Sequence, residues 1–134
     1  MAIQKKIIHS PQEMFDVGVE MAKKCRVVLL EGQLWAGKTT FIKWFASWLG
    51  INPQTVTSPT YTYIQTYENK LLHIDMYNII HFQQLVEKGI VELMHDYDFI
   101  AIEWPKFMDQ TWLENTVLMS IEKGEGDDRN ITVW

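Results

Sequence analysis

The segment that most constrains the fold runs from Val27 to Leu49 and reads VVLLEGQLWAGKTTFIKWFASWL. A short apolar run leads to Gly32, four residues separate this glycine from Gly37, Lys38 and Thr39, and a stretch with helical periodicity follows. A strand, a glycine-containing loop and a helix in this order form a P-loop, in which backbone N–H groups and the positive end of the helix converge on phosphate. Lys38 is expected to reach the outer phosphates of a nucleotide, and the Thr39 hydroxyl to hold Mg²⁺.

One residue of this loop departs from the usual pattern. Trp35 occupies a place where many P-loops have glycine, at a backbone position that often needs a positive φ. A bulky side chain is sterically costly in that conformation. The sequence therefore leaves open a binding or scaffold module whose P-loop has decayed.

Composition indicates one compact domain over residues 1–134. Of the 134 residues, 47% are hydrophobic and 22% are charged, which suits a chain with its own core. No apolar run approaches the roughly 20 residues that span a bilayer, and the first residues lack the pattern of a secretion signal, so we expect a cytoplasmic protein without a membrane partner. The net charge of -5 argues against a protein that grips nucleic acid by itself, because such binding depends on Lys and Arg.

Strands and helices are expected to alternate along the chain. Strands are expected near Lys5–His9, Arg26–Glu31, Tyr61–Glu68, Leu71–Met76, Phe99–Glu103, Thr116–Glu122 and Asn130–Trp134, and helices from Ser10 to Lys24, from the P-loop to Gly50, and over Phe82–Glu87 and Gly89–Asp96. The strand before the P-loop lacks polar alternation, as is typical of a parallel sheet covered on both faces. The predicted fold is a single-domain α/β, P-loop NTPase-like, three-layer structure with a central mixed, largely parallel sheet.

Local signals define the ends and faces of these helices. Ser10, Pro11 and Glu13 occupy the N-cap, first and third positions of a capping box, and Gly50 is expected to stop the helix that follows the P-loop. The strands of the central hairpin are expected to turn at Asn69 and Lys70. The residues expected to face the core are Phe41, Trp44, Phe45, Trp48 and Leu49 of the P-loop helix, and Leu85, Val86, Ile90, Val91, Leu93 and Met94 of the later helix pair.

Two acids follow apolar strands and can complete a Mg²⁺ site. Asp75 follows LLHI and Glu103 follows FIAI. In doubly wound sheets such acids lie at the carboxyl ends of neighbouring strands, where ligands collect. One acid is expected to support the metal and the other to orient the attacking water, and which does which stays open. His73 alternates with Asp75 on its strand, and a hydrogen-bonded structural role is expected for it.

Four blocks, GQLWAGKTT, SPTYT, HIDMYN and IEWP, resemble in order and separation the bacterial TsaE family, the small P-loop ATPases of tRNA threonylcarbamoyladenosine biosynthesis. The resemblance covers about residues 10 to 110. It implies that ATP and Mg²⁺ are bound, that Thr60 belongs to a switch-like loop near the γ-phosphate, and that Glu103 and Trp104 match the family's EW pair. The implied nucleotide-binding residues are Gly32, Gln33, Leu34, Trp35, Ala36, Gly37, Lys38, Thr39, Thr40, Thr60 and Trp104. The implied metal ligands are Thr39, Asp75 and Glu103, and the implied catalytic residues are Lys38, Asp75 and Glu103.

The family resemblance also implies partner proteins. The family usually has glycine in place of Trp35 and arginine in place of Asn78. An arginine that neutralises the transition state is worth roughly 1,000-fold in phosphoryl transfer. Neither Arg26 nor Arg129 lies in a motif, so we expect no strong arginine in cis and slow hydrolysis by the isolated chain. The implied partners are TsaD and TsaB type proteins, with tRNA involved only indirectly, and the chain alone is expected to be a monomer or to self-associate weakly.

Two other enzyme classes fit the sequence less well. A Ras-like GTPase is disfavoured because Leu72 stands where the guanine-reading Asp of an NKxD string is expected after Asn69 and Lys70. A small nucleotide or metabolite kinase usually clamps two phosphorylated substrates with several arginines, and this chain has two arginines in all.

Overall fold

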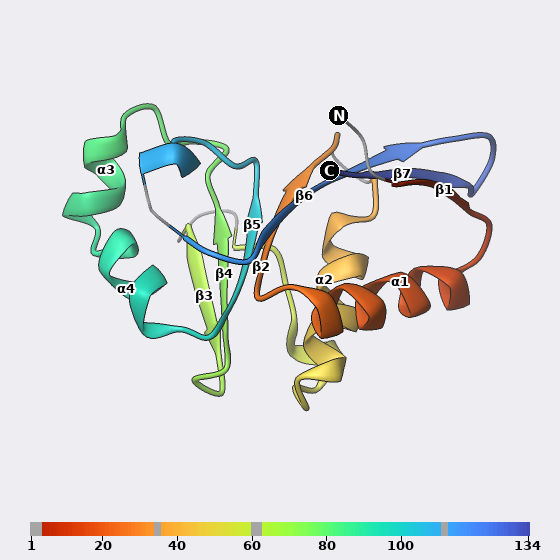
Figure 1. Cartoon of the computed structure of the whole chain (residues 1–134), viewed down its shortest axis with the longest axis horizontal. Coiled ribbons are helices and arrows are strands. Elements are labelled where there is room, and N and C mark those ends of the chain that lie inside the picture. The colour runs from red at the N-terminus through yellow and green to blue at the C-terminus, as the bar shows by residue number, and fades with distance from the viewer. Residues whose placement is uncertain (1–3, 34–35, 60–62, 111–112) are drawn as a thin grey trace.

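The computed structural model describes residues 4–33, 36–59, 63–110 and 113–134, and these form a three-layer α/β domain (Figure 1). Its strands make one sheet in the order β1-β7-β6-β2-β5-β4-β3. The strands are β1 (Gln4–Ile8), β2 (Val27–Glu31), β3 (Ile64–Tyr67), β4 (Leu71–Asp75), β5 (Phe99–Glu103), β6 (Thr116–Lys123) and β7 (Arg129–Val133). The predicted mixed α/β fold is confirmed.

Parallel pairing occupies the centre of the sheet. Strand β2 pairs in parallel with β5 and with β6, and β5 pairs in parallel with β4. The antiparallel pairs β3–β4, β6–β7 and β1–β7 lie at the two edges. Because the central strands run in one direction, the carboxyl ends of β2, β4 and β5 meet at one edge of the sheet, where ligands collect in such folds.

Helices cover both faces of the sheet (Figure 1). Along β2, Val28 and Leu30 join the core under α1 (Pro11–Lys24) and α2 (Lys38–Trp48), whereas Val27 and Leu29 join the core under α3 (Phe82–Glu87) and α4 (Ile90–Asp96). Burial on alternate sides explains why this strand is continuously apolar. Two short 3-10 turns, Pro53–Thr55 and Met108–Gln110, complete the regular structure of the described chain.

The capping box at the start of α1 forms in a modified way. Ser10 is the N-cap, and its Oγ accepts a hydrogen bond from the Glu13 N–H at 3.2 Å, as predicted. The Glu13 carboxylate accepts from the backbone N–H of His9 at 2.8 Å, one residue before the N-cap nitrogen that a capping box uses. The helix nevertheless begins and ends at the expected residues.

The inward face of α2 differs from the predicted one. Phe41 and Phe45 are fully buried as expected, but Ile42 and Ala46 share the core face, while the Trp48 side chain is 51% exposed. Lys23 Nζ lies 4.6 Å from the centre of the Trp48 ring, so this tryptophan packs under a cation and not in the core. The same error affects Val86 of α3, which is 44% exposed, whereas Leu85, Ile90 and Met94 are buried as predicted.

Two turns show how glycine and asparagine shape the chain. Gly50 has φ 84°, and its N–H donates to the Ser47 carbonyl, so it ends α2 as predicted. In the β3–β4 hairpin, Glu68 and Asn69 both have positive φ, as in a type I′ turn. The turn therefore lies one residue earlier than predicted, because Asn69 takes its second central position.

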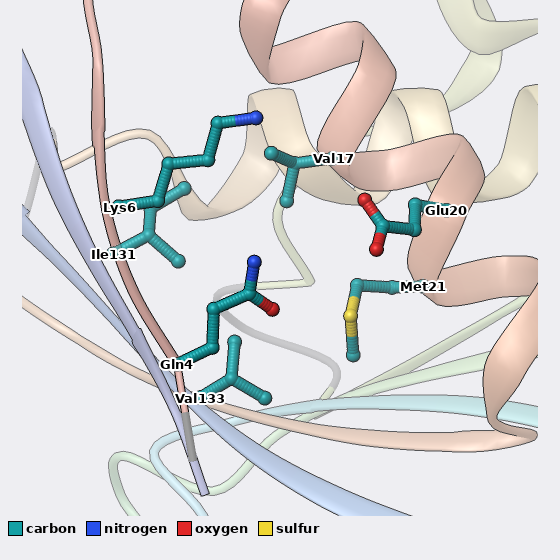
Figure 2. Close-up of a pocket in the computed structure, with 7 residues that line it drawn as sticks. All are labelled: Gln4, Lys6, Val17, Glu20, Met21, Ile131 and Val133. Carbon is teal, nitrogen blue, oxygen red and sulfur yellow. The ribbon is translucent and has the colours of Figure 1, made fainter. Parts of the chain in front are cut away.

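A small cavity and a buried thiol lie beside α1. Between α1 and the β1–β7 edge, packing leaves a cavity of about 20 Å³, room for one water molecule (Figure 2). Cys25, just after α1, is buried, and its Sγ–H donates to the Met21 carbonyl. Burial raises the pKa of this thiol from its ordinary value near 9 to about 11.

No helix in the described ranges is both long and apolar enough to cross a membrane.

Candidate functional site

Two glycines shape the loop between β2 and α2. Gly32 has φ 152°, and a Cβ atom at this position would lie 2.2 Å from the carbonyl oxygen of Ile121 on β6. Gly37 has φ 111° and is the N-cap of α2. Glycine is therefore required at both positions, by close approach at the first and by conformation at both. Leu34 and Trp35 lie outside the described residues.

Lys38 is folded back onto the loop. Its side chain is buried, and Nζ donates to the carbonyl of Gly32 and lies 4.0 Å from the centre of the Trp104 ring. Burial lowers the pKa of Lys38, while the carboxylates of Glu103 and Asp75 oppose this shift. An incoming phosphate offers the ammonium a stronger partner than a neutral carbonyl does.

The two acids lie side by side at the sheet edge. Asp75 of β4 and Glu103 of β5 are register partners, so their side chains project from the same face of the sheet. Asp75 Oδ1 accepts a hydrogen bond from the Tyr77 N–H at 2.8 Å. Burial, together with the neighbouring charge of Glu103, raises the pKa of Asp75, although the bond from Tyr77 opposes this. The nearby Lys38 and His73 also oppose the rise in the Asp75 pKa, but burial is its largest cause.

His73 holds Glu103 from the neighbouring strand. The side chains of His73 and Glu103 are 0% and 5% exposed, and His73 Nε2 lies 2.7 Å from Glu103 Oε2. No described residue accepts or donates a hydrogen bond at His73 Nδ1. The hydrogen-bonded role expected for His73 is confirmed, with Glu103 as its partner.

A cavity of about 680 Å³ collects most of the expected site. Its lining is Gly37, Lys38, Thr39, Thr40, Lys43, Val56, Thr57, Ser58, Asp75, Glu103, Trp104 and Arg129. Gly32 and Gln33 instead line another cavity of about 390 Å³, and Trp104 lines both cavities. Ala36 is 1% exposed and its side chain packs in the core, so only its backbone can serve a ligand. Thr60 lies outside the described residues.

Arg129 is the site residue that sequence position did not reveal. Its Nε donates to the Ala36 carbonyl at 2.8 Å, and its side chain lines the main cavity. Neither arginine lies in a sequence motif, yet Arg129 lies at this cavity, and the expectation of no strong arginine in cis stays a prediction. The missing signal was three-dimensional, because only the pairing of β6 with β2 brings the terminal hairpin beside the loop.

The donor atoms around the cavity fit Mg²⁺. Thr39, Asp75 and Glu103 supply a hydroxyl and two carboxylates, which are the hard oxygen ligands that this ion prefers. Within the described part of the chain, no group of three or more His, Cys, Asp or Glu residues forms an all-protein metal cage. Such a poor set of protein ligands is typical of Mg²⁺ that is bound together with substrate phosphates.

The arrangement as a whole suits a phosphorylated ligand. One cavity is lined by the first residues of α2 and by three positively charged residues, Lys38, Lys43 and Arg129. The two carboxylates that would complete a metal site line the same cavity. Cationic groups, a helix N-terminus and acids around one cavity can hold a polyphosphate together with its metal.

Comparisons with known proteins identify the relatives of this chain. A family model described as "Threonylcarbamoyl adenosine biosynthesis protein TsaE" matches residues 8–131. Proteins described as "tRNA threonylcarbamoyladenosine biosynthesis protein TsaE" include one from Bacillus subtilis, 35% identical over 83% of this chain and 70% of its own length. Another, from Treponema pallidum, is 35% identical over 80% of each chain. The crystal structure of Bacillus subtilis YdiB superposes with a TM-score of 0.72 at 28% identity, covering 99% of this chain and 86% of that one.

Proposed function

The chain belongs to the TsaE family of tRNA threonylcarbamoyladenosine biosynthesis, and from this premise we propose that it is the Mg²⁺-dependent ATPase of that modification machinery. The observation that carries the proposal is the convergence of Lys38, Thr39, Asp75 and Glu103 on one cavity at the carboxyl edge of the sheet. These residues come from separate segments of the chain, and a P-loop motif that arose by chance would not bring them together.

Each side chain has a task that its position supports. Lys38 leaves the Gly32 carbonyl and binds the outer phosphates, while the Thr39 hydroxyl and one of the acids hold Mg²⁺. The metal, when bound, neutralises charge on the phosphate oxygens. The other acid orients the attacking water. Glu103 is the better held of the two for this task, because the buried His73 fixes its carboxylate.

The nucleoside has its own place beside the phosphates. A cavity of about 320 Å³ adjoins the main one and shares Gly37, Thr40 and Arg129 with it. It extends to His9, Ser10 and Pro11 at the start of α1 and is large enough for a base and ribose. A nucleotide that spans both cavities would place its base against α1 and its terminal phosphate near the acids.

Partner proteins of the TsaD and TsaB type are part of this proposal. The Asn78 side chain carries no positive charge at a position where the family usually has arginine. A group supplied by the assembled complex can neutralise the transition state, as in other partner-activated phosphoryl transfer. We therefore expect slow turnover by the isolated chain and faster turnover in the complex, with tRNA acting only through that complex.

The test measures nucleotide binding and hydrolysis with matched variants. Wild type is expected to bind ATP in preference to GTP, Lys38→Ala to lose most of that affinity, and Lys5→Ala, on the exposed β1 edge, to bind as wild type does. Glu103→Gln is expected to keep binding and to lose about 100-fold or more in turnover with the partner proteins present. Absence of ATP binding by wild type, alone and with TsaD and TsaB type partners, would contradict the proposal. Phosphorylation of a nucleoside monophosphate would instead identify a kinase.

A further inference from the structure

Arg129 is held rigidly beside the phosphate loop. It is the first residue of β7, and its Nε donates to the Ala36 carbonyl at 2.8 Å. Its Nη1 donates to the carbonyls of Asp127 and Asp128 at 3.0 Å and 2.9 Å. No described residue accepts a hydrogen bond from Nη2. Within the described ranges the guanidinium is thus fixed by neutral carbonyls, and Nη2 is a donor with no partner among them.

The second arginine of the chain provides a direct contrast. Arg26 lies at the opposite end of β2, and its Nε, Nη1 and Nη2 donate to the carbonyls of Asp98, Glu114 and Tyr97. All three of its nitrogens are therefore engaged within the protein, which is a structural role. Arg129 has the same kind of anchorage, but the described residues engage only its Nε and Nη1, and the residue lines a cavity.

The terminal hairpin that carries Arg129 cannot easily move away from the loop. Strand β6 pairs with β2 from Val27 to Glu31, and β7 pairs with β6. The Ile121 carbonyl fills the space where Gly32 lacks a side chain, and a Cβ atom on Gly37 would lie 3.8 Å from Arg129 Nε. The guanidinium is therefore positioned before any ligand arrives, which lowers the entropic cost of a contact.

The location of Arg129 identifies the ligand group that it meets. Gly37, Thr40 and Arg129 line both the main cavity and the adjoining cavity that is proposed for the nucleoside. They mark the boundary between the two spaces. In a nucleotide that spans both, the group at this boundary is the phosphate nearest the ribose.

We propose that Arg129 binds the α-phosphate of the nucleotide through Nη2 while its Nε holds the loop at Ala36. This inference rests on the proposed ATP-binding function. The α-phosphate changes little in charge during γ-phosphoryl transfer, so the contact acts equally on the ground state and the transition state. Arg129 is therefore a nucleotide-binding residue, and the need for an activating group from a partner remains.

Binding measurements with Arg129→Gln test the proposal. A lost charge-assisted hydrogen bond is expected to weaken ATP and ADP binding about 10-fold or more and to raise KM similarly, with kcat nearly unchanged. Arg26→Gln is the matched control and is expected to bind as wild type does. Equal affinities of wild type and Arg129→Gln overturn the inference, whereas failure of wild type to bind any nucleotide overturns the proposed function itself.

An α-thio analogue separates phosphate contact from support of the loop. Wild type is expected to discriminate between the two diastereomers of adenosine 5′-O-(1-thiodiphosphate), and Arg129→Gln to discriminate less. Unchanged discrimination places Arg129 away from the α-phosphate and contradicts the proposal. If the Gln variant does not fold, Arg129→Lys, which keeps the charge but loses the planar fork, is expected to show the same change in smaller measure.

NMR of the unaltered protein gives an independent answer. The chain has two arginines, so side-chain signals of ¹⁵N-arginine-labelled protein are readily assigned. On addition of ADP, the Nη–H signals of Arg129 are expected to shift and to resolve as rotation of the guanidinium slows, while those of Arg26 stay in place. Arg129 Nη–H signals that neither shift nor resolve when ADP binds would rule out the contact.

Discussion

At the scale of the residue, the buried His73 has a testable part in the proposed ATPase activity. An unsatisfied N–H in a dry core costs more than an unused lone pair, so the proton lies on Nε2 and is donated to Glu103, leaving Nδ1 bare. His73→Gln can present an amide N–H at similar reach, whereas His73→Leu cannot. In the reconstituted ATPase, we expect the Leu variant to lose about 10-fold or more in kcat with a smaller change in KM, and the Gln variant to recover most of it. Equal losses in the two variants would show that His73 fills space without positioning Glu103.

Single residues also show which parts of the site the sequence could predict. Lys38, Asp75 and Glu103 were predictable because a local motif or the end of an apolar strand marks each of them. Arg129 was not, because it reaches Ala36 across 93 positions of sequence and no local pattern encodes that contact. Trp48 was placed wrongly because a tryptophan at helical spacing matches the core pattern even where a lysine covers its ring.

At the scale of the element, the P-loop and the β6 strand are fitted to each other through Gly32. Gly32→Ala is expected to destabilise the fold by about 3 kcal/mol or more, because it adds a Cβ atom 2.2 Å from the Ile121 carbonyl to an unfavourable φ. Gly126→Ala is the matched control, with φ 56° and no heavy atom within 4 Å of the added Cβ, and is expected to cost about 1 kcal/mol. Urea denaturation measures the free energy of unfolding of both variants. Similar losses would mean that β6 moves aside for the added Cβ atom at little energetic cost.

Elements were predictable where burial and turn chemistry act locally. The apolar strands β2 and β5 and the helices α3 and α4 lie where the sequence predicts them. The β3–β4 turn was predicted one residue too late. Asn69 tolerates positive φ at either central position of the turn, and the pairing of β3 with β4 determines which position it takes. The order of strands in the sheet depends on pairings between distant segments, which composition and periodicity do not describe.

At the scale of the whole molecule, the single cysteine makes the free energy of unfolding depend on pH in the alkaline range. The folded state keeps the Cys25 proton up to pH of about 11, whereas the unfolded chain loses it near pH 9. The unfolded state then binds fewer protons, so the free energy of unfolding falls as pH rises through this window, by up to about 2.7 kcal/mol for a two-unit difference. We expect urea denaturation between pH 8 and 11 to show a steeper decline for wild type than for Cys25→Ala. Parallel curves for the two proteins would contradict this role of the buried thiol.

The position of β7 between β1 and β6 has a consequence for the order in which the molecule can assemble during synthesis. Strand β1 is made first and pairs only with β7, so it waits without a partner while more than a hundred residues are added, a slow and non-local closure. A chain released within the turn at residues 124–128 contains every recognisable motif and still lacks Arg129. During synthesis, the loop after β2 is therefore made long before Arg129, and the candidate site is complete only when β7 has paired with β6.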